Sequence, residues 1–164
     1  MQTEKRVRTK LSTGYGKAIG LLVIASAIVL GSVLPGLLRP AWAADVVVYK
    51  SPTCGCCNKW VTHLEKHGFR VETHDERNMS RIKSELGVPR YLHSCHTAKV
   101  GDYIVEGHVP ADEITRLLSE KPGVRGLAVP GMPMGSPGME GPRKDAYDIL
   151  TFDEAGRTSV FASR

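Results

Sequence analysis

Hydrophobic residues beyond position 44 recur at the spacings of short strands and amphipathic helices. β-branched residues at 45–49 predict a buried strand, and the alternation at 69–73 predicts a second one. Between them, apolar residues recur at helical spacing from Cys57 to Leu64, and Gly68 is suited to end that helix. A strand, a helix and a second strand in this order predict a parallel pair joined by a right-handed crossover.

The periodic pattern continues as far as the third predicted helix. Asn78 is a suitable N-cap for a second helix, and two extended stretches are expected at 95–100 and 103–106. Pro110 is suited to the first turn of a third helix. The expected order over residues 45–120 is therefore β-α-β-α-β-β-α. A cysteine pair on the turn from the first strand into the first helix matches the thioredoxin-like arrangement, so we expect a thioredoxin-like α/β fold.

The end of the chain has a different composition. Residues 121–144 hold six glycines and five prolines without a periodic pattern, which predicts an irregular loop. Residues 145–164 contain two short β-type runs around a turn, which predicts a terminal hairpin. We therefore expect one domain over residues 44–164, in which a core at 45–120 is followed by the loop and the hairpin.

The N-terminal segment has the pattern of an export signal. Basic residues up to Lys17 precede an apolar run that begins at Ile19, and Ala41-Trp-Ala43 follows with small residues at alternate positions. This order predicts a secretory signal peptide at residues 1–43 and export to the periplasm. The alternative is an uncleaved anchor helix, since the apolar run approaches the length of a membrane span. In that case the chain contacts the membrane only through this leader.

The distribution of charge argues against a nucleic-acid partner. The leader holds six of the 22 Lys and Arg residues but one of the 17 Asp and Glu residues. Sixteen of each remain, so residues 44–164 carry no formal net charge. A nucleic-acid-binding domain would carry a basic patch of its own, and we therefore expect no nucleic acid among the partners.

Three of the four cysteines lie in one turn, Cys54-Gly-Cys56-Cys57. Unpaired N–H groups at a helix N-terminus favour the thiolate, which is a soft ligand for Cu(I) or Zn and the nucleophile of disulfide exchange. Cys54, Cys56 and Cys57 are therefore candidate metal ligands. Cys54 and Cys57 are also candidate catalytic residues if the protein is redox-active. The alternative is a structural disulfide between Cys54 and Cys57 in which Cys56 has no role.

A second candidate site lies at Ser94-Cys-His-Thr97. In a thioredoxin-like layout this segment lies beside the first strand, so Cys95 can supply a fourth sulfur. His96 is a further candidate ligand, and its alternative is a surface or hydrogen-bonded residue, since neighbours on an extended strand point to opposite faces. Four other histidines receive no metal role: His63 and His67 on a solvated helix face, and His74 and His108 without assignment.

A cluster of methionines forms the third candidate feature. Met132, Met134 and Met139 lie in the Gly- and Pro-rich segment. Their thioethers are soft ligands that suit Cu(I) and are hardly used by Zn. The alternative is that the loop packs these adaptable side chains against the core. The three methionines are thus candidate copper ligands.

Five strings of unusual composition lie between about residues 46 and 140. They are Tyr49-Lys-Ser-Pro-Thr-Cys-Gly-Cys-Cys57, Leu86-Gly-Val-Pro89, Ser94-Cys-His-Thr97, Val105-Glu-Gly-His-Val-Pro110 and Gly126-Leu-Ala-Val-Pro-Gly-Met-Pro-Met-Gly-Ser-Pro-Gly-Met139. Taken together, these strings resemble a family of periplasmic proteins associated with copper resistance, whose members are sometimes called CopG. The resemblance implies a thioredoxin-like fold that binds copper through Cys54, Cys56 and Cys57 and cycles Cu(I) and Cu(II).

Two functions remain open at the level of the sequence. The first is a periplasmic copper-binding protein, with copper ions and other copper-handling proteins as partners. The second is a thiol–disulfide oxidoreductase that acts on periplasmic proteins. Cys56 favours copper, because a dithiol catalyst needs one attacking and one resolving thiol and a third thiol competes with them. An adaptor with an inert disulfide is a third alternative. Whether the protein is an enzyme depends on which of these applies.

Overall fold

The computed structural model describes residues 45–164. The predicted leader and its cleavage site lie outside the described residues. Within 45–164, none of the helices combines the length and the hydropathy that a transmembrane span requires.

The helices and strands follow the order expected from the sequence. In chain order the elements are β1 (Val46–Lys50), α2 (Gly55–Lys66), β2 (Val71–Asp75), α3 (Met79–Glu85), the 3-10 helix η2 (Arg90–Leu92), β3 (His96–Val100), β4 (Tyr103–Glu106), α4 (Ala111–Glu120), β5 (Gly126–Ala128), β6 (Asp148–Phe152) and β7 (Thr158–Ser163). The predicted β-α-β-α-β-β-α order and the terminal hairpin are confirmed.

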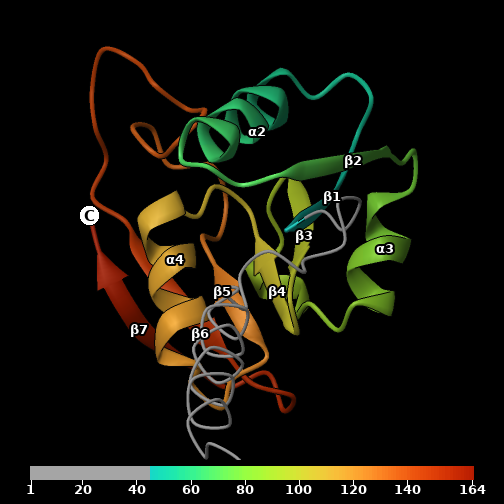
Figure 1. Ribbon diagram of the computed structural model, residues 1–164, viewed down its shortest axis with the longest axis vertical. Helices are drawn as coiled ribbons and strands as arrows, with labels where there is room; N and C mark the ends of the chain where they lie inside the picture. Colours follow the sequence, from blue (N-terminus) through green and yellow to red (C-terminus); the bar gives the residue numbers. More distant parts are fainter. Residues whose placement is uncertain (1–44) are drawn as a thin grey trace, which may run out of the picture. The chain divides into compact units, whose positions relative to one another are not determined.

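Within residues 45–164 the strands form one seven-stranded sheet in the order β2-β1-β3-β4-β5-β6-β7 (Figure 1). β1 is parallel to β2 and antiparallel to β3, while β4 is parallel to β5. Helices α2 and α4 make the two parallel crossovers. The register pairs Lys50 at the end of β1 with His96 at the start of β3, and Glu106 at the end of β4 with Thr97. The segments that follow β1 and β4 therefore meet the one that precedes β3.

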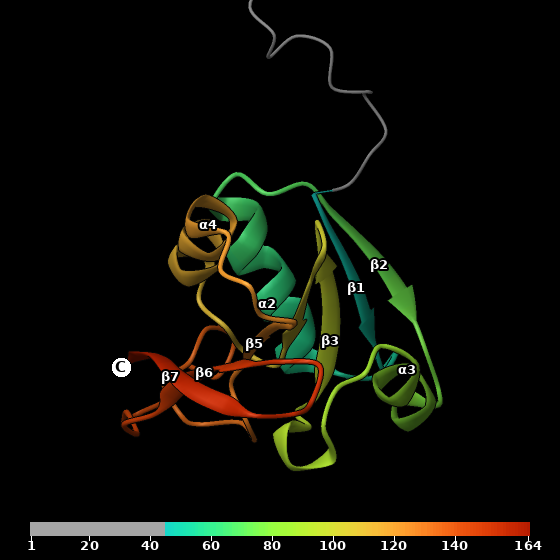
Figure 2. The ribbon, with the colours of Figure 1, turned by 90° about the horizontal axis from the view of Figure 1, so that it is seen from below.

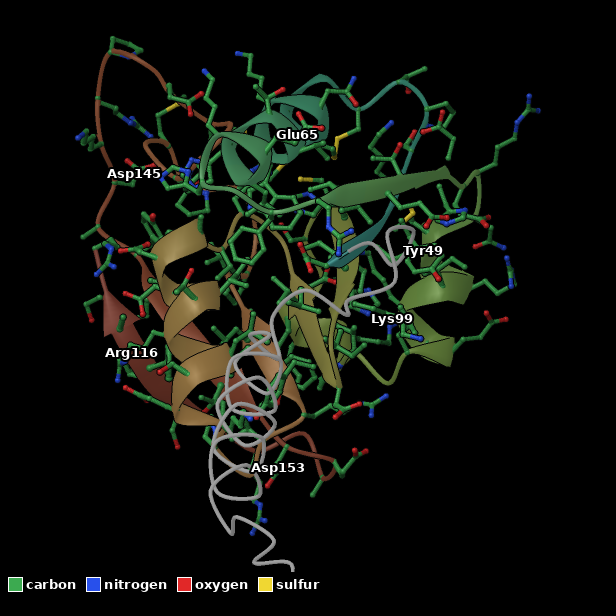
Figure 3. The ribbon with its side chains drawn as sticks, in the orientation of Figure 1. Tyr49, Glu65, Lys99, Arg116, Asp145 and Asp153 are labelled. Carbon is green, nitrogen blue, oxygen red and sulfur yellow. A yellow bond between two sulfur atoms is a disulfide. The ribbon has the colours of Figure 1, made fainter. Side chains whose placement is uncertain are left out.

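Helices cover both faces of the sheet (Figure 2). α2 and α4 pack on one face, and charged side chains such as Glu65 and Arg116 point outward from them (Figure 3). Their core with the strands includes Val46, Val48, Trp60, Leu64, Ala98, Val105, Ile114, Leu117 and Leu127. α3 packs against β1 and β3, and a second core cluster contains Val88, Leu92, Ile104, Ala128 and Phe152. Alternation along β3 sends His96 and Ala98 to the α2 face and Thr97 to the α3 face.

The N-cap residue explains where α3 begins. The side chain of Asn78 accepts a hydrogen bond from the backbone N–H of Arg81 at 3.1 Å, as expected for an N-cap. This bond satisfies one of the backbone donors that the first turn of a helix leaves without a partner. The predicted cap is therefore confirmed.

The prediction of a continuous loop at residues 121–144 is wrong for β5, which fills the space between β4 and β6. A strand of three residues is too short to show a period. Its first residue is Gly126, where an added Cβ would lie 1.8 Å from the carbonyl oxygen of Ile104. A glycine that indicates irregular structure in the sequence is thus required here by the close approach of β4.

Candidate metal centre

The start of α2 brings three cysteines together. Cys54 is the N-cap residue, and its Sγ accepts a hydrogen bond from the backbone N–H of Cys57 at 3.3 Å. Cys57 is fully buried, whereas Cys54 and Cys56 are half-buried. A sulfur at this position receives the partial positive charge of the helix N-terminus. The turn therefore favours negatively charged sulfur, as the sequence suggested.

Two of these cysteines form a disulfide in the described structure. Cys54 and Cys57 are bonded, with their Cα atoms 5.3 Å apart. Cys56 Sγ lies 3.5 Å from Cys54 Sγ and does not belong to the disulfide. The pairing is that of the structural-disulfide alternative, but Cys56 is in contact with a further sulfur, so it is not isolated.

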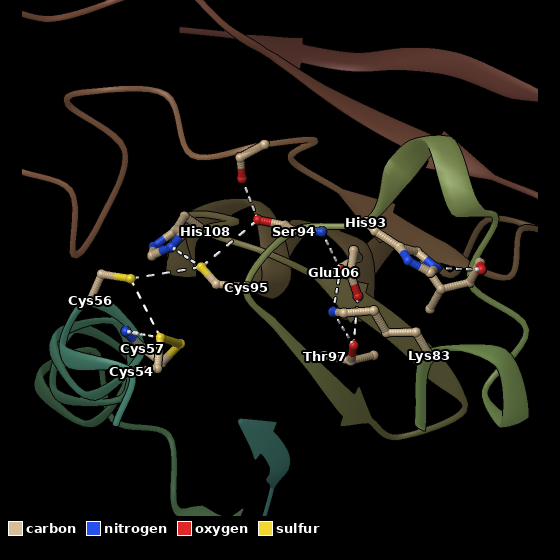
Figure 4. A network of polar contacts seen from close by, with 12 residues as sticks. Cys54, Cys56, Cys57, Lys83, His93, Ser94, Cys95, Thr97, Glu106 and His108 are labelled. Carbon is tan, nitrogen blue, oxygen red and sulfur yellow. Dashed lines mark hydrogen bonds and ion pairs between the residues drawn. A yellow bond between two sulfur atoms is a disulfide. The ribbon is translucent and has the colours of Figure 1, made fainter. Parts of the chain in front are cut away.

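That further sulfur belongs to Cys95, whose Sγ lies 3.7 Å from Cys56 Sγ (Figure 4). Cys95 lies in a bend directly before β3 and is half-buried. Burial, followed by the neighbouring Cys56, raises the pKa of Cys95 to about 12. The sulfurs of Cys54, Cys56, Cys57 and Cys95 all lie within 4.8 Å of one another. With the disulfide reduced, these side chains can present four soft ligand atoms to one volume.

His108 completes this arrangement on the side of Cys95. Its Nε2 lies 2.8 Å from Cys95 Sγ, and its Nδ1 lies 2.7 Å from the carbonyl oxygen of Pro137. A carbonyl can only accept, so Nδ1 donates the hydrogen. Burial lowers the pKa of His108 and keeps the ring neutral, which leaves a lone pair on Nε2 facing the sulfur. Sequence reasoning missed this residue; its position just after the strand that pairs with β3 was the available signal.

His96 is fully buried beside the same group. Its ring is 4.2 Å from that of Trp60 and 4.9 Å from that of His108, measured between centroids. Among the described residues, neither of its ring nitrogens has a hydrogen-bond partner. Burial lowers the pKa of His96 well below its ordinary value. A buried imidazole without partners is costly unless another atom satisfies it.

Cys95, His96 and His108 form a second group of donor atoms within 4.8 Å of one another. Alternation along a strand was expected to point Cys95 and His96 to opposite faces. Because Cys95 lies in the bend before β3 and not in the strand, both side chains reach this group. The two groups share Cys95, so its sulfur can contact two neighbouring ions.

The Gly- and Pro-rich segment folds over the start of α2. Gly138 lies so close to it that an added Cβ would be 2.7 Å from the carbonyl oxygen of Cys56. Met132 is 54% exposed, Met139 is half-buried, and the Sδ of Met134 lies beside Gly141. The segment is thus anchored against the cysteines, and its methionines differ in exposure.

The other histidines have local partners. His63 Nε2 accepts a hydrogen bond from the backbone N–H of Ala111, and His67 Nδ1 contacts the carbonyl oxygen of His63. His67 is exposed but His63 is half-buried, so the expected solvated face applies to His67 alone. His74 is exposed and pairs with Glu72 on β2.

Comparisons with known proteins give a family match and two structural matches. Residues 92–139 match the family described as "Protein of unknown function, DUF411". Two solved structures, described as "Copper resistance protein copG- Form 2" and "Copper resistance protein copG- Form 1", are each 48% identical to this chain and cover 73% of it. The chain covers 96% of the first and 95% of the second, with a TM-score of 0.69 for both. No curated protein matches.

Proposed function

This chain belongs to the family of the copper resistance protein CopG, and from that membership we propose that it binds copper ions through its cysteine cluster. Copper is here the cargo of the protein. The observation that carries the proposal is the gathering of four cysteine sulfurs within 4.8 Å of one another. Thiolates in such a group suit Cu(I).

The proposed ligands extend beyond the sulfurs. His96 and His108 contribute ring nitrogens next to Cys95, and the unpartnered nitrogens of His96 support a role for a bound ion. A thiolate of Cys95 shared by both donor groups would hold two copper ions side by side. Met132, Met134 and Met139 supply thioethers from the segment that folds over α2.

The disulfide links copper binding to oxidation state. A sulfur in a disulfide bond is not a thiolate, so copper binding by all four cysteines requires the Cys54–Cys57 bond to be reduced. Two Cu(I) ions can supply the two electrons: each becomes Cu(II), the S–S bond breaks, and two thiolates form. In this proposal the protein cycles Cu(I) and Cu(II) as part of copper resistance. We further propose that it works in the periplasm with other copper-handling proteins.

A second candidate function is thiol–disulfide exchange with other proteins. The Cys54–Cys57 disulfide at the start of α2, with Cys54 half-buried, favours it. The neighbouring Cys56 and Cys95 oppose it, because their thiols compete for the mixed disulfide that such a catalyst forms with its substrate.

The test is a titration of the domain at residues 44–164 with Cu(I) against a coloured competing chelator, after anaerobic reduction of the protein. We expect strong binding by the reduced protein, weaker binding by the oxidised protein, and a loss of affinity or stoichiometry in both Cys54→Ser and Cys56→Ser. Far-UV circular dichroism should stay close to that of the parent. If Cys56→Ser binds copper like the parent while Cys54→Ser does not, the multi-sulfur site is wrong.

Turnover of a disulfide-bonded protein substrate separates the two functions. We expect slow turnover by the parent in comparison with a dedicated oxidoreductase. Fast turnover, together with copper binding that does not depend on Cys56, would replace the copper proposal with the second function.

A further inference from the structure

A buried ion pair lies on the opposite face of the sheet from α2. Lys83 on α3 and Glu106 at the end of β4 are 2.6 Å apart between Nζ and Oε1, and their side chains are 5% and 0% exposed. Nothing in the copper proposal uses these two charges. In the fold, however, they lie next to Ser94, in the segment that carries Cys95 (Figure 4).

The carboxylate of Glu106 has three donors. Its Oε1 accepts from the ammonium of Lys83 and from the backbone N–H of Ser94, each at 2.6 Å. Its Oε2 accepts from the hydroxyl of Thr97 at 2.6 Å, and Lys83 also contacts that hydroxyl at 2.9 Å. A charged acceptor makes shorter and stronger hydrogen bonds than a neutral one. Glu106 thus connects α3, β3 and β4 to the chain at Ser94.

Ser94 precedes Cys95, so this contact bears directly on the sulfur. The backbone of Ser94 is held by Glu106, and its hydroxyl donates to the carbonyl oxygen of Gly131. Gly107 leaves the room for this side chain, since an added Cβ there would lie 2.5 Å from Ser94 Oγ. The backbone N–H of Ser94 does not take part in the hydrogen-bond ladder of β3, because that strand begins only at His96. Without Glu106, the N–H of Ser94 would lack its acceptor.

The energetics favour a role in positioning over a role in stability. Moving two charges out of water is costly, and replacing a buried pair by apolar residues of similar volume is often neutral or stabilising. What apolar residues cannot do is accept a hydrogen bond from a backbone N–H. The acceptor oxygen is therefore the feature that this site requires.

We propose that Glu106, held by Lys83 and Thr97, is a positioning residue for Cys95. By fixing Ser94 from the α3 face, it keeps Cys95 Sγ 3.7 Å from Cys56 and 2.8 Å from His108. This inference rests on the proposed function for its consequence in copper binding, although the positioning itself concerns the metal-free protein.

Two double variants test the acceptor. Lys83→Met with Glu106→Leu removes both charges and the acceptor. Lys83→Met with Glu106→Gln removes both charges but keeps an oxygen for Ser94, while the amide nitrogen can donate to Thr97. The two proteins differ at one position. Glu113→Leu is the control for loss of a buried carboxylate, because Glu113 is 4% exposed and pairs with Arg116 and Arg164 on α4 and at the C-terminus.

The first readout is the alkylation rate of Cys95 by iodoacetamide in a Cys56→Ser background with the disulfide intact, where Cys95 is the remaining free thiol. We expect the Leu double variant to react at least about tenfold faster, because the segment opens more often. The Gln double variant and Glu113→Leu should react at nearly the parent rate. The inference is overturned if the Leu variant reacts like the parent, or if all variants accelerate together.

The second readout is Cu(I) affinity with Cys56 restored. Residues that orient metal ligands typically change affinity by about 10- to 100-fold when replaced, and we expect such a loss for the Leu double variant alone. If the parent binds no Cu(I), the proposed function fails while the alkylation result still decides the positioning.

Amide hydrogen exchange of the unmodified protein supplies a test that needs no variant. The N–H of Ser94 should exchange slowly although it lies outside a strand. Exchange as fast as in an unstructured peptide would refute the hydrogen bond to Glu106, even if the Leu double variant does not fold.

Discussion

The four cysteine sulfurs occupy different environments although they lie within 4.8 Å of one another. Cys57 is buried and oxidised with Cys54, while Cys56 lies between Cys54 and Cys95. Cys56 is thus the sulfur that connects the α2 turn to the segment before β3. A protein that needed only a stable cross-link would gain nothing from a thiol at this position.

His108 is the residue whose role is most directly testable at this scale. His108→Asn keeps a nitrogen that can donate to the carbonyl oxygen of Pro137 but removes the Nε2 lone pair that faces Cys95. We expect Cu(I) affinity to fall at least about tenfold, which corresponds to about 1.4 kcal/mol. Competition with a coloured chelator measures this change.

The matched control is His74→Asn, since His74 is exposed on β2 and pairs with Glu72. Its Cu(I) affinity should equal that of the parent. Equal losses in both variants, or none in His108→Asn, would remove His108 from the ligand set.

Among the elements, the segment that folds over α2 depends on close backbone packing. Gly138 has a φ of 88°, and an added Cβ would lie 2.7 Å from the carbonyl oxygen of Cys56 and 3.0 Å from the backbone nitrogen of Trp60. Gly138→Ala should therefore lower the free energy of unfolding by more than about 1 kcal/mol. Thermal or urea denaturation measures it.

Gly123→Ala serves as the control, because an added Cβ there meets no atom within 4 Å. It should leave the unfolding midpoint nearly unchanged. If Gly138→Ala behaves like this control, the segment does not pack against α2 as described.

The same segment carries the methionines, and replacing Met132, Met134 and Met139 with Leu isolates their sulfurs. Leu keeps the bulk and the apolar character, so stability should change by less than about 1.5 kcal/mol. We expect Cu(I) affinity to fall while Zn affinity is unchanged, since thioethers hardly bind Zn. Parallel titrations with both metals measure the difference.

Met79→Leu on α3 controls for the substitution itself, and its affinities should match those of the parent. Unchanged Cu(I) affinity in the triple variant would assign the loop methionines to packing.

For the whole molecule, the export predicted from residues 1–43 would determine where the chemistry takes place. The pattern at residues 1–43 predicts cleavage after Ala43, so the exported protein should begin at Ala44. Intact mass and N-terminal sequencing of the periplasmic fraction from cells that express the full chain measure this directly. A full-length product in the membrane fraction would establish the uncleaved anchor instead.

The sheet brings distant segments together at one end. The ends of β1 and β4 meet the start of β3 through the pairs Lys50 with His96 and Glu106 with Thr97. Cysteines that are 39 positions apart in sequence are thereby placed in contact. The same end of the sheet receives the buried carboxylate that holds Ser94.

Local patterns in the sequence were sufficient for most of the elements and for the type of chemistry. Periods of two and 3.6 residues report the conformation of a short segment, so the strands and α-helices from β1 to α4 and the terminal hairpin were predictable, but the 3-10 helix η2 was not. Three cysteines in one turn at a helix N-terminus favour thiolate chemistry, because that end of a helix stabilises negatively charged sulfur. The resemblance of whole strings implied the same thioredoxin-like fold and favoured copper among the possible uses of the thiolates.

The thioredoxin-like layout led us to expect Cys95 beside the cysteine turn, but only the tertiary structure decided which other side chains meet. The contacts of Cys95 with His108, of Glu106 with Ser94, and of Gly126 with β4 depend on the register between strands. A shift of one residue in that register would turn each side chain to the other face, and the pattern of one strand does not show which residues of a distant strand lie opposite it. The bend at Cys95 was not predicted either, since an extended stretch was expected from residue 95. It lets Cys95 and His96 share one site, because the ladder of β3 begins one residue later.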